Sequence, residues 1–74
     1  MIKKYSDIRT EVLKEDGTVV WRVDVITCSD EGEYAVLIDN YTWNYYVYTG
    51  IDYEEAQCLK VIISGVLDFL VNGS

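Results

Sequence analysis

The sequence contains no histidine and no proline. Histidine is the side chain whose charge changes near neutral pH, so its absence excludes histidine-based proton transfer, nucleophile activation and metal ligation. The five glycines stand apart from one another and form no phosphate-binding loop. Because proline is absent, no position is barred from donating a backbone N–H to a sheet. We expect a protein that is not an enzyme and that carries no cofactor and no metal.

Cysteine is also scarce, since Cys28 and Cys58 are the only two. A secreted domain of 74 residues would normally carry several disulfides, and the first residues, MIKKYSDIRTE, lack the apolar segment of a secretion signal. The longest apolar run, CLKVIISGVLDFLV, has 14 residues and contains Lys60 and Asp68, so it is too short and too charged to span a membrane. We expect a cytoplasmic protein with reduced thiols and no membrane partner, with a Cys28–Cys58 bridge as the alternative.

Basic residues are scarce beyond Arg22, because Lys60 is the only one among residues 23–74. That segment holds nine acidic residues and a net charge of −8, whereas residues 1–22 hold five basic and four acidic residues, a net charge of +1. The total of −7 repels phosphate backbones, so direct nucleic-acid binding is disfavoured. A basic protein surface is the expected partner.

The segment IRTEVLKEDGTVVWRVDVITC predicts two paired strands, because the Asp-Gly pair at positions 16 and 17 suits a two-residue hairpin turn. In that register Glu11 faces Arg22 and Arg9 faces Asp24, while apolar residues share the other side. A three-residue loop with a bulge is the alternative. It would place Glu11 beside Trp21 on the core side, and we prefer the first register.

Two further strands and a helix complete the expected fold. SDEGE predicts a turn, EYAVLID a third strand and YTWNYYVYT a fourth, whose alternation places Trp43 and Tyr45 on the core side facing the helix. Asp52 suits the N-cap of the helix, with Glu55 three positions later, and Gly73 suits the C-terminal cap. The prediction is a single α+β domain, residues 1–74, with a four-stranded antiparallel β-meander and one C-terminal α-helix packed on one face. Its strands are expected at about residues 5–14, 18–28, 33–39 and 42–49, and its helix at about 53–72.

The expected helix has a polar side and an apolar side. Its polar stripe, at three- and four-residue spacing, consists of Gln57, Lys60, Ser64 and Asp68. Its apolar arc, the side expected against the sheet, includes Leu59, Ile62, Ile63, Val66 and Leu70. The arc is wider than the ~100° that a surface helix needs. The second face of the sheet also carries apolar residues, so a homodimer is a possible assembly. The dimerisation residues would be Leu13, Val20 and Ile26.

Residues 39–56, DNYTWNYYVYTGIDYEEA, hold five of the seven tyrosines between carboxylates and contain no basic residue. Tyrosine is enriched at interface hot spots, and arginine both stacks on aromatic rings and binds carboxylates. A surface of tyrosines and acids therefore suits an arginine-rich groove on a partner. The expected partner-binding residues are Asp30, Glu31, Glu33, Asp39, Tyr41, Tyr46, Tyr48 and Glu54.

Acidic and aromatic residues are concentrated in three segments, SDEGE, DNYTWNYYVYT and DYEEA. In these segments the chain resembles the small phage-encoded anti-defence proteins, such as anti-CRISPR and anti-restriction inhibitors. The resemblance implies a non-catalytic inhibitor that imitates phosphate charge and docks on the nucleic-acid-binding site of a host nuclease or defence complex. The alternative function is a structural or regulatory homodimeric module with no role as a nucleic-acid mimic.

Overall fold

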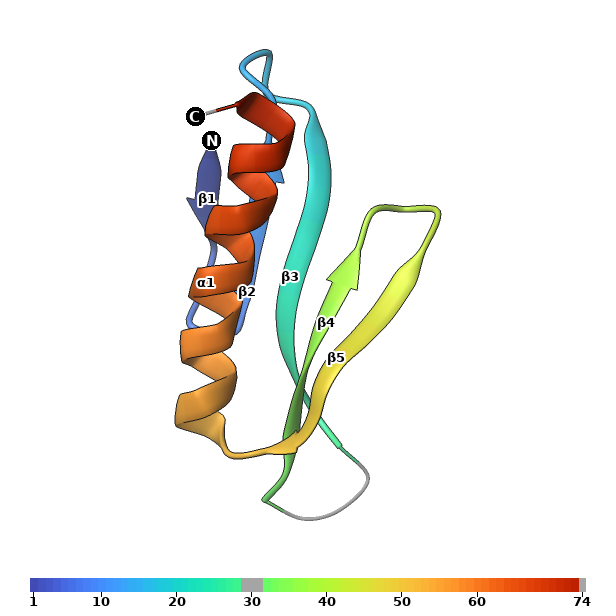
Figure 1. Cartoon of the computed structure of the whole chain (residues 1–74), viewed down its shortest axis with the longest axis vertical. Coiled ribbons are helices and arrows are strands. Elements are labelled where there is room, and N and C mark those ends of the chain that lie inside the picture. Colours follow the sequence, from blue (N-terminus) through green and yellow to red (C-terminus); the bar gives the residue numbers. More distant parts are fainter. Residues whose placement is uncertain (29–31, 74) are drawn as a thin grey trace.

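The chain folds into a five-stranded antiparallel sheet with one helix across one face. The computed structural model describes residues 1–28 and 32–73, and the side chains of residues 48 and 49 are outside that description. The elements are β1 (Ile2–Lys4), β2 (Arg9–Leu13), β3 (Val19–Thr27), β4 (Tyr34–Asp39), β5 (Asn44–Ile51) and α1 (Tyr53–Asn72). The strands follow the order β1-β2-β3-β4-β5, and α1 lies mainly over β2 and β3 (Figure 1). The predicted α+β meander with a C-terminal helix is confirmed.

The prediction of four strands was wrong, because the N-terminal segment forms two. β1 pairs antiparallel with β2, with Ile2 opposite Val12. Between the two strands the chain reverses, and the Tyr5 N–H donates to the Arg9 carbonyl oxygen at 3.0 Å. A three-residue strand is too short to produce a recognisable alternation of apolar and polar residues. It forms one edge of the sheet.

The predicted pairing of β2 with β3 is confirmed from Arg9 to Val12. Arg9 lies opposite Asp24, and Glu11 lies opposite Arg22. The Arg9 guanidinium donates to the two carboxylate oxygens of Asp24 at 3.1 and 3.3 Å. Opposite charges therefore meet across the strands on one face, which leaves the other face free to pack apolar residues.

The turn between these strands differs from the prediction. Its loop has three residues, 15–17, instead of two. Lys14 N–H donates to the Thr18 carbonyl oxygen at 2.9 Å, and Gly17 takes a left-handed conformation with a φ of 89°. A bulge after Val12 leaves one extra residue on β3. The bulge offsets the longer loop, so the pairing of the remaining residues is the predicted one.

The helix begins and ends where the sequence predicts. The Asp52 carboxylate accepts a 2.8 Å hydrogen bond from the Glu55 N–H, which satisfies a backbone donor of the first turn. At the other end Gly73, with a φ of 75°, donates its N–H to the Phe69 carbonyl oxygen at 2.7 Å. Both ends are fixed by interactions between residues close in sequence.

The side of α1 that packs on the sheet is not the expected one. Its buried residues are Ala56, Lys60 and Ser64, at 0, 2 and 1% exposure. Two of them belong to the predicted polar stripe. The expected apolar arc is divided between two environments. Its members Leu59 and Ile63 are partly buried beside the core, whereas its members Ile62, Val66 and Leu70 are exposed.

Small side chains and paired polar groups explain this orientation. Ala56 and Ser64 let the helix approach the sheet more closely than larger side chains would allow. The Ser64 hydroxyl donates to the Lys60 carbonyl oxygen at 2.7 Å, so its burial leaves no unpaired hydroxyl. The apolar stem of Lys60 is buried, and its Nζ donates to the Ser6 carbonyl oxygen at 3.3 Å.

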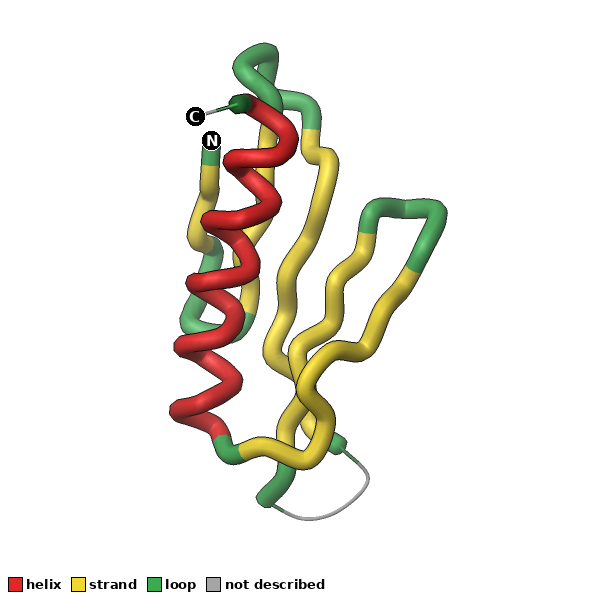
Figure 2. Tube along the Cα trace, viewed as in Figure 1, coloured by secondary structure: helices red, strands yellow, loops and turns green. Residues whose placement is uncertain are grey.

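The β4–β5 hairpin diverges from α1 toward its turn (Figure 2). Tyr45 lies on the helix side of the sheet, since it pairs with Ile38 and through it with Val23 of the core. Its side chain is nevertheless 51% exposed, and Trp43 is 58% exposed. The prediction that these two rings belong to the core was wrong, because α1 covers β2 and β3 and leaves the turn end of the hairpin uncovered.

Candidate functional site

Apolar side chains are exposed along the side of α1 that faces away from the sheet. The five large ones are Val61 at 65%, Ile62 at 60%, Val66 at 54%, Phe69 at 59% and Leu70 at 71% exposure. Cys58, also exposed, and Gly65 lie among them on the same helix. We call these seven residues the outer helix face. Exposed apolar patches on proteins are typical of surfaces that contact another protein, a ligand or a membrane.

The outer helix face carries no charged side chain. The acids Glu54 and Glu55 precede it in the first helical turn, where they stabilise the positive end of the helix dipole. The last turn has no basic residue, and Lys60 is buried on the opposite side. A Cβ added at Gly65 would meet no atom within 4 Å. Because glycine within a helix costs ~0.5–1 kcal/mol relative to alanine, packing inside the chain gives no reason for a glycine there.

A second cluster lies where β4 ends, and it consists of Arg22, Asp39 and Tyr41. The Arg22 guanidinium donates a hydrogen bond to the Asp39 carboxylate, and its Cζ lies 5.2 Å from the centroid of the Tyr41 ring. Asp39 also accepts from the Tyr41 N–H at 2.9 Å. This hydrogen bond first, and Arg22 second, lower the pKa of Asp39 against an opposing effect of burial. The buried Nε of Arg22 has no hydrogen-bond partner among the described residues.

The sheet face opposite the helix is close to neutral. Along one row of cross-strand neighbours the charges alternate in sign: Lys3, Glu11, Arg22 and Asp39. The next row holds the ion pair of Arg9 with Asp24, whose Nε–Oδ1 distance is 3.1 Å. The acidic excess of the sequence is therefore not displayed on this face.

The structure separates the predicted partner-binding residues along the molecule. Asp39 and Tyr41 lie at the turn end of the β4–β5 hairpin. Glu33 precedes β4 at its other end, and Glu54 lies in the first turn of α1 at that same end (Figure 1). A strand of six residues spans roughly 17–20 Å. Glu33 is half-buried, and Glu54 is exposed.

Of the four other predicted residues, Tyr46 is the one whose side chain is described. Tyr46 is 66% exposed and pairs with Leu37 on the sheet face opposite the helix. Asp30 and Glu31 lie outside the described residues, as does the side chain of Tyr48. Among the five predicted residues whose side chains are described, a hydrogen bond joins Tyr41 to Asp39, and Arg22 contacts both.

The residues predicted for dimerisation lie on the sheet and present little surface. Leu13 is 9% exposed, and its carbonyl oxygen accepts hydrogen bonds from the Met1 amino group at 2.8 Å and from Asn72 Nδ2 at 2.9 Å. Val20 and Ile26 are half-buried. Among the described residues, the largest run of exposed aliphatic side chains is on α1.

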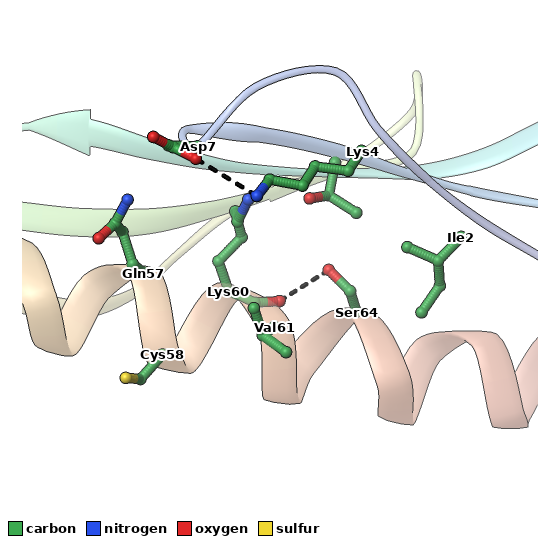
Figure 3. A pocket seen from close by; sticks show the side chains of 9 residues that line it. Ile2, Lys4, Asp7, Gln57, Cys58, Lys60, Val61 and Ser64 are labelled. Atoms are coloured by element: carbon green, nitrogen blue, oxygen red, sulfur yellow. Dashed lines mark hydrogen bonds and ion pairs between the residues drawn. The ribbon is translucent and has the colours of Figure 1, made fainter.

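A cavity of about 450 Å³ lies between β1 and α1 (Figure 3). Lys4, Asp7, Thr10 and Lys60 line it, and Lys4 Nζ forms a 3.3 Å ion pair with Asp7. Burial lowers the pKa of Lys60, and the nearby charge of Lys4 adds to this effect. The Lys60 amine donates to the carbonyl oxygen of Ser6. Its role in this geometry is to fasten α1 to the β1–β2 connection.

Within residues 1–28 and 32–73, no three cysteine, aspartate or glutamate side chains gather as ligands for a metal ion. Over the same residues, no helix combines the length and apolar composition of a membrane span. Cys28 and Cys58 are both free thiols, the first half-buried and the second exposed.

No family model, no curated protein and no solved structure matches this chain. The functional argument consequently rests on the geometry described above. The sequence did not predict the outer helix face, because the apolar arc of the helix was expected to pack against the sheet. The signal that would have found it is the spacing of Ala56, Lys60 and Ser64, since two small residues eight positions apart allow close packing on that side.

Proposed function

We propose that this protein is a non-catalytic interaction module that binds another protein through the outer helix face. The proposal rests on one observation: five large apolar side chains of α1 are 54–71% exposed while the polar stripe of the same helix is buried. Fully burying one such side chain is worth ~1.5–3 kcal/mol. Covering all five therefore supplies much of the free energy that an association needs.

The charge pattern of α1 favours a protein over a lipid bilayer as the ligand. Helices that lie in a membrane interface carry lysine and arginine along their polar side. Here the one lysine of the helix, Lys60, is buried against the sheet. Asp68 already binds the amino group of Met1. The charged residues left on the helix are Glu54 and Glu55 of the first turn, which anionic headgroups repel.

The acidic inhibitor is the second candidate function. Tyr41 and Tyr46 are 68 and 66% exposed, and the net charge of −7 attracts basic surfaces such as the nucleic-acid site of a host nuclease or defence complex. Arg22 weighs against this candidate, because it already binds the carboxylate of Asp39. Both candidates act in the cytoplasm, where the two free thiols stay reduced.

Affinity capture with matched baits, from a lysate of cells that also express the untagged chain, tests the proposal. Ile62→Glu places a charge on the outer helix face, and Tyr46→Ser removes a side chain of similar exposure from the opposite face of the sheet. We expect the wild type and Tyr46→Ser to retain the same proteins at about 0.1 M and about 0.5 M salt, and Ile62→Glu to lose them. If the captured proteins are lost at high salt and with the Tyr46→Ser bait, and are retained by the Ile62→Glu bait, the result would favour the acidic inhibitor instead.

A further inference from the structure

We infer that the protein bound by the outer helix face is a second copy of this chain, with the two α1 helices antiparallel about a two-fold axis. The inference rests on the proposed function and names its partner. A two-fold interface uses the same patch on both copies, so the patch must be complementary to itself. The outer helix face meets this condition in the shape of its central residues and in the absence of charged side chains.

The positions of large and small residues on the face are matched about its midpoint. We place the two-fold axis of the antiparallel pair level with the midpoint between residues 63 and 64. A residue of one copy then lies at the same height as the residue of the other copy for which the two numbers add up to 127. Cys58 is then level with Phe69 of the second copy, and Gly65 is level with its Ile62. In both of these central pairs a large side chain is level with a small one, which is the arrangement that lets two helices interdigitate.

Glycine at the centre of this face is explained by such a pair. A Cβ at Gly65 would meet no atom within 4 Å in the single chain, so this position borders open space that the chain itself does not fill. Helix axes approach to 8–10 Å depending on the side chains at the contact, and a central glycine permits the shorter distances.

The helix dipoles favour the antiparallel arrangement, and the acidic residues predict its salt dependence. Opposed helices place their dipoles in the favourable relative orientation. Each copy carries a net charge of −7, yet the contact itself is uncharged, and Glu54 and Glu55 lie at its rim. Screening weakens the repulsion between copies, so raising the salt concentration strengthens the dimer. A complex of the acidic surface with a basic partner responds in the opposite direction.

The expected affinity is modest. A helix of 20 residues is about 30 Å long and 10–12 Å wide, which gives roughly 300–360 Å² in projection, less than the ~800 Å² per partner of a standard interface. We expect a dissociation constant in the micromolar range, and sedimentation velocity from about 5 to about 500 µM covers that range.

The decisive variant is Gly65→Leu. It removes a helix-interior glycine where the single chain has free space, so the fold becomes more stable while the hollow between the copies is filled. We expect dimerisation at least tenfold weaker than in the wild type, together with a higher melting temperature. Ile62→Glu should also give a monomer, and Tyr46→Glu, on the other side of the molecule, should leave the dimer intact. A wild type that is monomeric throughout, or a Gly65→Leu variant that dimerises like the wild type, would overturn the inference.

Oxidative crosslinking tests the direction of the helices. In a Cys28→Ser, Phe69→Cys variant the two remaining thiols of one chain are about 16.5 Å apart along the helix, beyond the 4.4–6.8 Å between Cα atoms that a disulfide spans. Antiparallel dimers should therefore form disulfides between position 58 of one copy and position 69 of the other, identified by non-reducing peptide mapping. Links of 58 to 58 and 69 to 69 would indicate parallel helices and contradict the inference.

The two proposals fail in different ways. If the wild type stays monomeric while the lysate capture still depends on Ile62, the outer helix face binds a different protein. In that case only the identification of the partner as a second copy is wrong. If neither self-association nor capture responds to Ile62→Glu, the interaction module itself is wrong.

Discussion

The guanidinium of Arg22 is bound between the carboxylate of Asp39 and the ring of Tyr41. It donates a hydrogen bond to Asp39, and its Cζ lies 5.2 Å from the centroid of the Tyr41 ring. Sequence composition predicted that an acid and a tyrosine in this segment would receive an arginine from a partner. The structure shows the same chemistry satisfied within the chain, which reduces the charge that this end of the molecule offers to another protein.

Releasing this arginine should create the docking site that the wild type keeps occupied. In Arg22→Gln we expect the pKa of Asp39 to rise toward its ordinary value while staying below it, because the Tyr41 N–H remains as a donor. Binding of a short arginine-rich peptide should become several-fold tighter. NMR titration of the carboxyl carbons and of the peptide complex measures both. Arg9→Gln makes the same charge change at the Asp24 pair. If both variants bind the peptide equally more tightly than the wild type does, the net charge of the protein alone would explain the gain in affinity.

The orientation of α1 predicts an inverted response to substitution. Ser64→Leu adds volume on the buried side and removes the hydrogen bond to Lys60, so it should lower the free energy of unfolding by ~1–3 kcal/mol. Ile62→Gln, on the exposed side, should change that free energy by less than ~0.5 kcal/mol in dilute protein. Urea unfolding followed by circular dichroism gives both values. The opposite ranking would show that the apolar arc packs on the sheet.

The buried amine of Lys60 predicts a rise of stability in alkali. Its pKa in the folded protein is lowered by burial, so between that value and the ordinary value of about 10.5 the unfolded chain binds more protons than the folded one. Unfolding should therefore become harder as the pH rises through this window. Lys60→Met keeps an apolar stem and has no such proton to lose. We expect the difference in unfolding free energy between wild type and Lys60→Met to change with pH only in this window. A difference that stays constant from pH 8 to 10.5 would contradict a lowered pKa of Lys60.

The carboxylate of Asp68 predicts a loss of stability in acid. The amino group of Met1 and the side chain of Asn72 donate to it and lower its pKa, in that order of importance. The stabilisation by the Asp68 carboxylate is complete above the pKa of this group in the unfolded chain, ~4. It disappears as the pH falls through the lower pKa of the folded chain. Asp68→Asn should lose less stability than the wild type between about pH 5 and pH 2. Glu54→Gln removes a charge away from this contact, and an identical acid response in both variants would argue against the role of Asp68.

The parts of the fold that were predicted depend on contacts between neighbours in sequence or between adjacent strands. The N-cap of Asp52, the left-handed Gly73 and the facing charges of Arg9 and Asp24 are of this kind. The longer hairpin loop changed the pairing of Leu13 and left the register from Arg9 to Val12 unchanged, because a bulge after Val12 absorbed the difference.

The candidate site could not be predicted in the same way. Hydrophobic periodicity gives the two sides of a helix, and it assumes that the more apolar one is buried. In α1 the closer fit of Ala56 and Ser64 to the sheet decides the orientation instead. Likewise, the exposure of Trp43 and Tyr45 follows from how much of the sheet one helix covers, a quantity that no segment encodes by itself.

The amino-acid sequence alone determined the class of fold, the ends of the helix, the pairing of the central strands and the absence of histidine chemistry, because each depends on residue type and short-range geometry. Only the tertiary structure decided which side of α1 meets the sheet, and hence which apolar surface is left for a partner. The physical reason is that close packing is a property of two whole surfaces in contact, and it selects shape as well as hydrophobicity.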